Sequence, residues 1–248
     1  MLSLPRLTAI LLLPVFGTGC DGDGGRSQLT GAGGGAGEDP AVPGEIPRVD
    51  QRATAALLLK TACASCHGAN GEGNRQLSAP SIAGLPGWHV RIQLKKFRDG
   101  TRGAHPEDVS GSQMRAIAQA LSDTQIEDLG PLVQAMPVHP TKSGDAVAGA
   151  DLEEGKYIYG LECAGCHRFN GQGELVFESA PLTTLPDWYL VDAVDKFTRA
   201  VRGYDEKSDP HGYGMRRASK GMTREQIRDV IGYVATLAEK YPPDLEQN

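Results

Sequence analysis

Two pentapeptides bring together residues that could hold a metal cofactor: residues 63–67 read CASCH, and residues 163–167 read CAGCH. The spacing Cys-x-x-Cys-His is that of covalent haem attachment, in which both thiols bond to the porphyrin vinyl groups and the adjacent imidazole is placed to bind iron. Two copies predict two covalently bound haem c groups. We expect thioether bonds at four cysteines and iron ligation at two histidines: Cys63, Cys66, Cys163, Cys166, His67 and His167.

A single motif of this kind has rivals. It could be half of a zinc site, which needs a further Cys or His pair, or a thioredoxin-like redox pair in a βαβ setting. The surroundings of the two motifs argue against both, because Ala-Pro, Leu-Pro, Trp, Lys-Phe, Arg-Gly and Met-Arg recur at an offset of 100 or 101 residues. The chain therefore contains two copies of one haem domain and is not a many-repeat array, whose periods are shorter.

The elements that must position the motifs are predicted to be helical. Six segments, three per repeat, have helix-forming composition or apolar residues at helical spacing: 52–64, 88–98, 122–135, 152–161, 188–199 and 223–241. Two of them open with capping-box patterns, Ser122 with Gln125 and Thr223 with Gln226. Clear strand alternation is scarce, so we predict an all-α fold.

Composition divides the chain into segments. A short apolar run at the start, followed by small residues, is typical of a secretory signal, and the next segment is rich in Gly, Pro and acidic residues that cannot form a core. We expect a signal peptide of lipoprotein type at 1–19, a disordered tether at 20–48, a first domain at 49–137, a linker at 138–150, a second domain at 151–241 and a C-terminal tail at 242–248.

One cysteine lies outside the two motifs. Cys20 follows Gly17-Thr18-Gly19, which resembles a bacterial lipoprotein signal, although that family prefers Leu where Gly17 stands. We expect Cys20 to be lipidated and the protein to be periplasmic and anchored to a membrane by its acyl chains. The alternative is a soluble exported protein that is cleaved nearby.

The repeated motifs resemble those of the dihaem cytochrome c4 family and related tandem class I cytochromes c, over roughly residues 54–241. The resemblance implies two small helical domains, each wrapped around a covalent haem. It implies Met114 and Met215 as the second iron ligands. It also implies that the carbonyl groups of Pro80 and Pro181 orient the ligand histidines.

The repeat supports these methionines independently. Met114 and Met215 occupy equivalent positions, whereas Met136 and Met222 have no methionine counterpart in the other repeat. Bis-histidine ligation is the rival. None of the remaining histidines is duplicated, so we expect surface or structural roles for His89, His105, His139 and His211.

Two further pairs of side chains recur. Trp88 and Trp188 could pack against the haem edges or belong to the ordinary core. Arg102 and Arg202 could pair with the haem propionates, since guanidinium suits carboxylate recognition, or could be solvated surface residues.

Two axial protein ligands leave no coordination position for a substrate. We therefore expect an electron-transfer protein with redox protein partners and no small-molecule substrate, and not an enzyme. Met/His ligation raises the reduction potential, which suits transfer from a quinol-oxidising complex or small donor to a terminal oxidase or similar acceptor. The alternatives are a dihaem oxidoreductase of peroxidase or thiosulfate dehydrogenase type, and a cytochrome subunit of a larger respiratory complex.

The charge of the chain indicates which kinds of partner to expect. The formal net charge is −6, and no basic patch interleaves with aromatic residues, so nucleic acid is excluded as a partner. Residues 51–137 hold 9 Lys and Arg against 7 Asp and Glu, whereas residues 151–248 hold 12 against 17. Domains of unequal charge can dock different partners by electrostatic steering, unless the charge serves solubility alone.

Overall fold

The computed structural model describes residues 49–50, 53–138 and 144–242, which all belong to one compact unit, Pro40–Asn248. The expected signal peptide and the whole of the expected tether, with the lipidation site at Cys20, lie outside the described residues. So do residues 139–143 of the linker and residues 243–248 of the tail.

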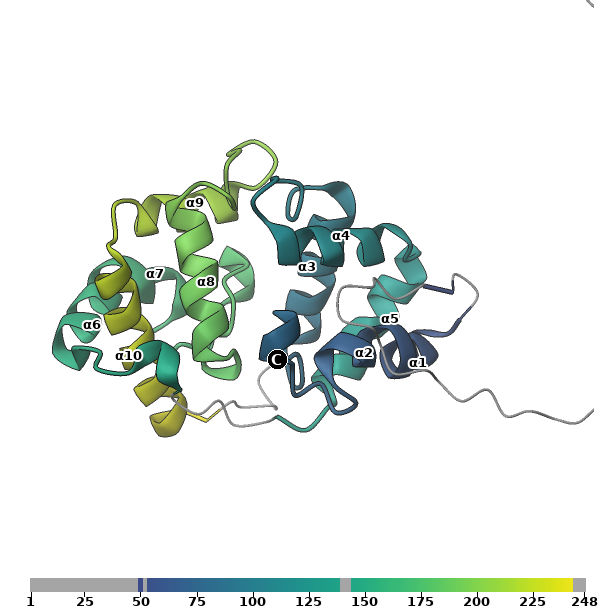
Figure 1. Cartoon of the computed structure of the whole chain (residues 1–248), viewed down its shortest axis with the longest axis horizontal. Coiled ribbons are helices and arrows are strands. Elements are labelled where there is room, and N and C mark those ends of the chain that lie inside the picture. Colours follow the sequence, from purple (N-terminus) through teal and green to yellow (C-terminus); the bar gives the residue numbers. More distant parts are fainter. Residues whose placement is uncertain (1–48, 51–52, 139–143, 243–248) are drawn as a thin grey trace, which may run out of the picture. The chain divides into compact units, whose positions relative to one another are not determined.

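Helices dominate the described residues, in two successive sets of the same order (Figure 1). The first set is α1 Ala55–Leu58, α2 Ala64–His67, α3 Gly87–Asp99, α4 Val109–Gln119 and α5 Asp123–Gln134; the second is α6 Leu152–Ile158, α7 Ala164–His167, α8 Asp187–Thr198, α9 Pro210–Ser219 and α10 Arg224–Lys240. Within the described ranges the only β pairing consists of isolated bridges, Asn74 with Ala79 and Glu174 with Ser179. The predicted all-α fold is confirmed.

Short turns of other helix types connect these elements. Two are π-helical, Leu59–Cys63 and Tyr159–Cys163, and four are 3₁₀-helical, Arg75–Leu77, Asp145–Val147, Leu175–Phe177 and Leu182–Thr184. No helix among the described residues is long and apolar enough to cross a bilayer.

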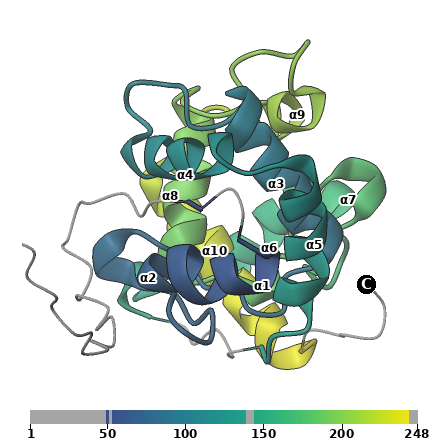
Figure 2. The same ribbon diagram turned by 90° about the vertical axis from the view of Figure 1, so that its right-hand side faces the viewer.

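Each set packs around an apolar core, and Leu85 and Val133 of the first repeat also join the core of the second. In the first, α3 lies against α4 and α5, and α1 lies against α5 (Figure 1 and Figure 2). Leu58 and Ile126 are almost fully buried there, at 1% and 0% exposure, and burying such side chains contributes about 1.5–3 kcal/mol each. In the second, α6 and α8 pack on α10, with Ile227 and Val234 buried between them.

Local signals account for most helix ends. Both predicted capping boxes are present: Ser122 pairs with Gln125 at the start of α5, and Thr223 pairs with Gln226 at the start of α10. The predicted helices agree with α3, α5, α8 and α10 to within a residue or two.

The sequence patterns did not predict α4 and α9. The signals that could have found them are Asp108 and Asp209, which accept hydrogen bonds from the first-turn N–H groups of these two helices, with Pro210 as a favourable first residue of α9.

Candidate haem-binding sites

Each Cys-x-x-Cys-His motif lies at the end of an irregular helix. In the first repeat, α1 passes through the π-helical turn Leu59–Cys63 into α2, which ends at His67 because Gly68 turns the chain away with φ +82°. In the second, the turn Tyr159–Cys163 leads into α7. A π-helical turn inserts an extra residue into the helix, a feature frequent at functional sites. Here it alters the direction in which the two cysteines and the histidine leave the helix.

Both motif histidines are set up to bind a metal through Nε2. Nδ1 of His67 donates to the carbonyl oxygen of Pro80 at 2.8 Å, and Nδ1 of His167 donates to the carbonyl oxygen of Ala180 at 2.9 Å. A carbonyl oxygen can only accept, so Nδ1 carries the proton and Nε2 keeps its lone pair. Burial lowers the pKa of both imidazoles more than these hydrogen bonds raise it, so both are neutral at pH 7.

The second of these contacts corrects the expectation for Pro181. The acceptor of the His167 bond is Ala180, the residue before it, and Pro80 and Ala180 both stand 13 positions after their histidine. The repeats thus stay in register at an offset of 100 through this region, although the Ala-Pro dipeptides are offset by 101. The position along the chain, and not the proline itself, supplies the carbonyl.

Each histidine shares a cavity with the methionine predicted to be its partner. A cavity of about 140 Å³ is lined by Cys63, His67 and Met114. A second cavity, of about 230 Å³, is lined by His167 and Met215 together with both cysteines of the second motif. Folding thus brings an imidazole and a thioether 47 or 48 residues apart onto the walls of one hollow in each repeat.

The helix that carries Met114 is positioned by close backbone packing. The side chain of Asp108 accepts from the N–H of Gly111 at 3.1 Å and begins α4. A Cβ on Gly103 would lie 2.3 Å from the carbonyl oxygen of Gly111, so only glycine allows the loop after α3 to approach α4 this closely. This contact sets the distance between Met114 and the cavity.

The arginines in the cavity walls indicate whether haem fits these cavities. Arg102 and Arg202 are half-buried, and each guanidinium lies 4.3 Å from the centre of a phenylalanine ring, Phe97 or Phe197. Among the described residues, no carboxylate lies within ion-pairing distance of either guanidinium, and Nε of Arg102 is buried without a hydrogen-bond partner. Burial, and then the charge of Arg102, lower the pKa of Arg202 to about 10.

An unpaired cation removed from water is costly. A porphyrin brings two propionate groups, and these anions suit the two guanidinium groups, of which that of Arg102 donates only to the neutral side chains of Gln93 and Tyr189. The residues therefore fit haem, and the arginines lie on the cavity walls, unlike solvated surface residues.

His89 is a buried residue and not a surface one. It is 7% exposed, and its Nδ1 has no hydrogen-bond partner among the residues that the structure describes. Burial, followed by the charges of Arg102, Arg202 and Lys96, lowers its pKa to about 3. Both cavities have His89 in their walls, along with Gln93, Arg102, Leu185 and Tyr189.

The other unduplicated histidines differ from His89. His105 is half-buried, and its Nδ1 accepts from the N–H of Glu107. His211 lies on the rim of the second cavity, where its Nδ1 is 3.4 Å from Glu178. His139 lies outside the described residues.

The two tryptophans line neither cavity. Each packs edge-to-face on the next residue of its helix, Trp88 on His89 at 5.5 Å and Trp188 on Tyr189 at 6.1 Å. They therefore pack against residues that line the cavities without lining a cavity themselves. This agrees with a place in the ordinary core and not with contact with the haem edge.

A covalent haem domain is defined by two thiols and an adjacent imidazole that can bind a metal through Nε2, held by helices beside an apolar cavity. This chain contains two such domains. The zinc alternative needs a further ligand pair, and no group of three or more His, Cys, Asp and Glu side chains suited to a metal occurs in the part of the chain that the structure describes. A family model, Cytochrome c, matches residues 52–134 and 152–238. The chain belongs to the cytochrome c family, and its cofactors are two covalently bound haem c groups.

Similar proteins include an electron acceptor, a subunit of a complex and a cytochrome c4. The chain is 27% identical over 186 residues to the thiosulfate dehydrogenase electron acceptor of Stutzerimonas stutzeri, which covers 72% of this chain and 80% of that protein. It is 30% identical over 228 residues to the cytochrome bc1 complex cytochrome c subunit of Mycobacterium tuberculosis, covering 87% of this chain and 75% of that one. Reduced cytochrome c4 from Pseudomonas stutzeri has the same fold, with a TM-score of 0.58 at 20% identity over 75% of this chain and 97% of that chain. The resemblance to dihaem cytochrome c4 is confirmed.

Proposed function

We propose that this chain is an electron carrier with no catalytic site of its own. The observation that supports the proposal most directly is the pairing of His67 with Met114 in one cavity and of His167 with Met215 in the other. If both residues of a pair held the iron, they would leave no coordination position for a substrate. Haem iron then supplies reversible one-electron exchange between its ferric and ferrous states.

The residues favour a high reduction potential. The thioethers of Met114 and Met215 stabilise ferrous iron more than nitrogen donors do, and the apolar walls disfavour the additional charge of the ferric state. The chain is therefore suited to accept electrons from a quinol-oxidising complex or small donor and to pass them to a terminal oxidase or similar acceptor. The names of two relatives, an electron acceptor of thiosulfate dehydrogenase and a cytochrome bc1 complex subunit, support a role of this kind.

Carbon monoxide distinguishes the carrier from an enzyme. We expect the reduced holoprotein at neutral pH to bind no stoichiometric carbon monoxide, and a redox titration to give two reversible one-electron steps. Binding at one haem would mean an open axial position and would favour the alternative, a dihaem oxidoreductase of peroxidase or thiosulfate dehydrogenase type.

We further propose that the carrier is periplasmic and is held at a membrane through lipidated Cys20. A second possibility, suggested by the cytochrome bc1 relative, is a subunit of a larger complex. Mild-detergent extraction of native membranes separates the two, because a subunit co-purifies with its complex and a carrier elutes alone.

The proposed domains are residues 49–137 and 151–241, joined by residues 138–150. The two sets of helices support this division, since each contains its own motif and its own pair of histidine and methionine on one cavity wall. Each half expressed separately in a host that matures c-type cytochromes should retain covalent haem on a denaturing gel.

A further inference from the structure

The attachment motif of the second repeat is surrounded by exposed apolar side chains. From Leu161 to Phe177, five large apolar side chains have exposures between 44% and 74%. We call these residues the attachment patch: Leu161, Phe169, Leu175, Val176 and Phe177.

Contacts place several members of the patch close to the motif or the cavity. Ser179 donates through Oγ to the carbonyl oxygen of Cys166 at 2.6 Å, which holds the turn Leu175–Phe177 against the motif. Phe177 lines the same cavity as Cys163 and Cys166. Leu161 lies in the π-helical turn that ends at Cys163, and Phe169 follows the motif and packs edge-on against Tyr241 at 5.6 Å.

The first repeat has the same backbone plan without the patch. The residues at the corresponding positions are Thr61, Ala69, Arg75, Gln76 and Leu77. Arg75 forms an ion pair with Asp145, so this turn presents a charged side chain. The fold therefore does not require large apolar residues at four of the five positions, and Leu77 is the exception.

The second motif is also more open than the first. Cys166 is exposed, whereas Cys66 is half-buried. Gly165 has no heavy atom within 4 Å of where its Cβ would be, while its counterpart Ser65 has a side chain that donates to the carbonyl oxygen of Ala62. The attachment edge is thus most accessible where the apolar side chains gather, and contiguous exposed apolar surface marks interaction sites.

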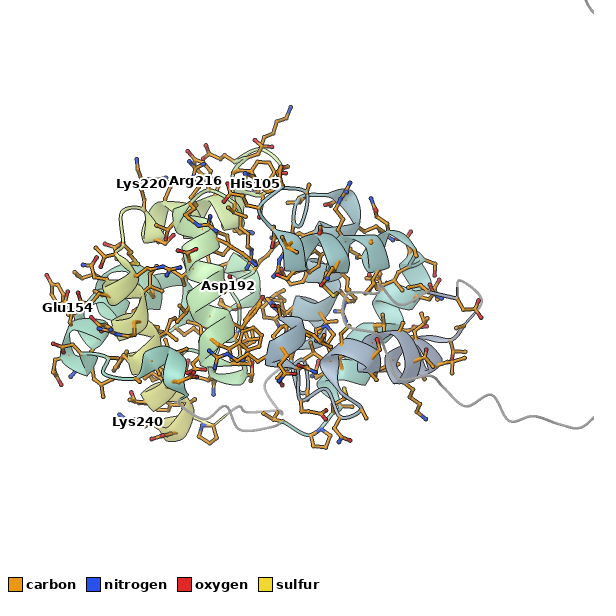
Figure 3. The ribbon with its side chains drawn as sticks, viewed as in Figure 1. His105, Glu154, Asp192, Arg216, Lys220 and Lys240 are labelled. Atoms are coloured by element: carbon orange, nitrogen blue, oxygen red, sulfur yellow. The ribbon has the colours of Figure 1, made fainter. Side chains whose placement is uncertain are left out.

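Charge indicates which partner fits. Residues 151–179 contain six acidic and two basic residues, whereas residues 51–79 contain one acidic and three basic. Glu162 is exposed beside the patch and lies at the cavity rim, and Glu154 projects outward from α6 (Figure 3). A surface with an apolar centre and an acidic rim is complementary to a partner surface with an apolar centre and a basic rim.

We propose that the attachment patch is the surface on which the second domain docks a redox protein whose own contact face is apolar at its centre and basic at its rim. This proposal rests on the carrier function. The exchange is a single electron that leaves the reduced member of the pair, which is oxidised, and reduces the other; no bond changes and no proton moves.

The two repeats provide the substitutions for a test. A triple variant of the full-length holoprotein takes the residues of the first repeat: Leu161→Thr, Phe169→Ala and Val176→Gln. The probe is a small c-type cytochrome with a lysine-ringed haem edge, and stopped-flow absorbance at low ionic strength measures the second-order rate constant of electron exchange. We expect the rate constant to fall about tenfold or more, with haem spectra and reduction potentials unchanged.

Two controls keep the test specific. Val109→Thr removes an apolar side chain that is 68% exposed in the first domain, and it should leave the rate constant unchanged. An acidic cytochrome of similar size and potential should react more slowly than the basic probe, and added salt should slow only the basic one.

The outcomes separate the proposals. A triple variant that reacts as fast as the unmodified protein, a Val109→Thr variant that is slowed equally, or a faster reaction with the acidic probe would each overturn the docking surface and leave the carrier function intact. If the unmodified protein exchanges electrons with neither probe, the carrier function fails and the docking proposal fails with it.

Discussion

Gly203 and Gly212 touch backbone to backbone: a Cβ on Gly203 would lie 2.1 Å from the carbonyl oxygen of Gly212. Gly203 also has φ +63°, a conformation that L side chains rarely adopt. The loop after α8 and the first turn of α9 can therefore meet only through glycine. Since α9 carries Met215, this contact determines where the thioether enters the second cavity.

Replacing Gly203 should disturb Met215 without touching it. We expect Gly203→Ala to lower the free energy of unfolding by about 1–3 kcal/mol and to weaken the Met–iron charge-transfer absorption of one haem. Denaturant titration and visible spectroscopy measure the two effects. Gly160→Ala is the control, because a Cβ there meets nothing within 4 Å. A normal spectrum in Gly203→Ala would show that the contact does not position the ligand.

Removing either predicted methionine ligand should affect one haem only. We expect Met114→Ala and Met215→Ala each to abolish about half of the Met–iron charge-transfer absorption and to lower one of the two reduction potentials, because a thioether favours ferrous iron. Met136→Ala is the matched control, since Met136 lines neither cavity. If the spectrum of either variant is unchanged, that methionine does not bind iron.

Arg202 should raise the potential of a nearby haem. It lines the second cavity without a described carboxylate partner, so Arg202→Gln removes a positive charge that disfavours ferric iron. We expect one potential to fall by about 60 mV, the effect of a unit charge about 12 Å away at an effective dielectric constant of about 20. Spectroelectrochemical titration checks this. Arg217→Gln removes an exposed charge from the same domain and should shift neither potential by more than about 10 mV.

Asp108 should make stability depend on pH. Burial by itself raises the pKa of Asp108, but the charge and hydrogen bond of Lys196, 3.0 Å away, with Arg102 and the Gly111 N–H, outweigh burial and lower it. A lowered carboxyl pKa stabilises the fold above the unfolded-state value, and this contribution is lost as pH falls through the folded-state value.

We therefore expect Asp108→Asn to cost roughly 2–3 kcal/mol of unfolding free energy at pH 7, with the difference from the unmodified protein shrinking below about pH 4. Urea titrations across this pH range measure it. Asp145→Asn breaks an exposed pair with Arg75 and should leave the free energy of unfolding almost unchanged, because exposed ion pairs contribute little. A pH-independent difference would mean that Asp108 acts through its shape and not its charge.

Cys20 should hold the protein at the membrane. With Cys20→Ser we expect haem-stained protein to move from the membrane fraction to the soluble exported fraction, because the acyl chains can no longer be attached. Ser27→Ala, a substitution in the same segment, should leave the distribution unchanged. Membrane retention of the Cys20→Ser protein would mean that something other than a lipid anchors it.

Contiguous patterns were enough to predict the cofactor and the helices α3, α5, α8 and α10. Covalent attachment uses neighbouring residues, so Cys63 and His67 identify it without knowledge of the fold. Helical periodicity and capping are likewise local, and for that reason Ser122 and Gln125 located the start of α5. The duplication added a long-range clue, since it paired Met114 with Met215.

Folding alone decided the contacts between distant segments. Nothing local distinguishes Ala180 from Pro181 as the partner of His167, because the choice depends on how a loop lies against a helix. The burial of His89 between two cavities and the gathering of Leu161 and Val176 near one motif are also products of packing. Such contacts join residues that are far apart along the chain, and periodicity and spacing carry no information about them.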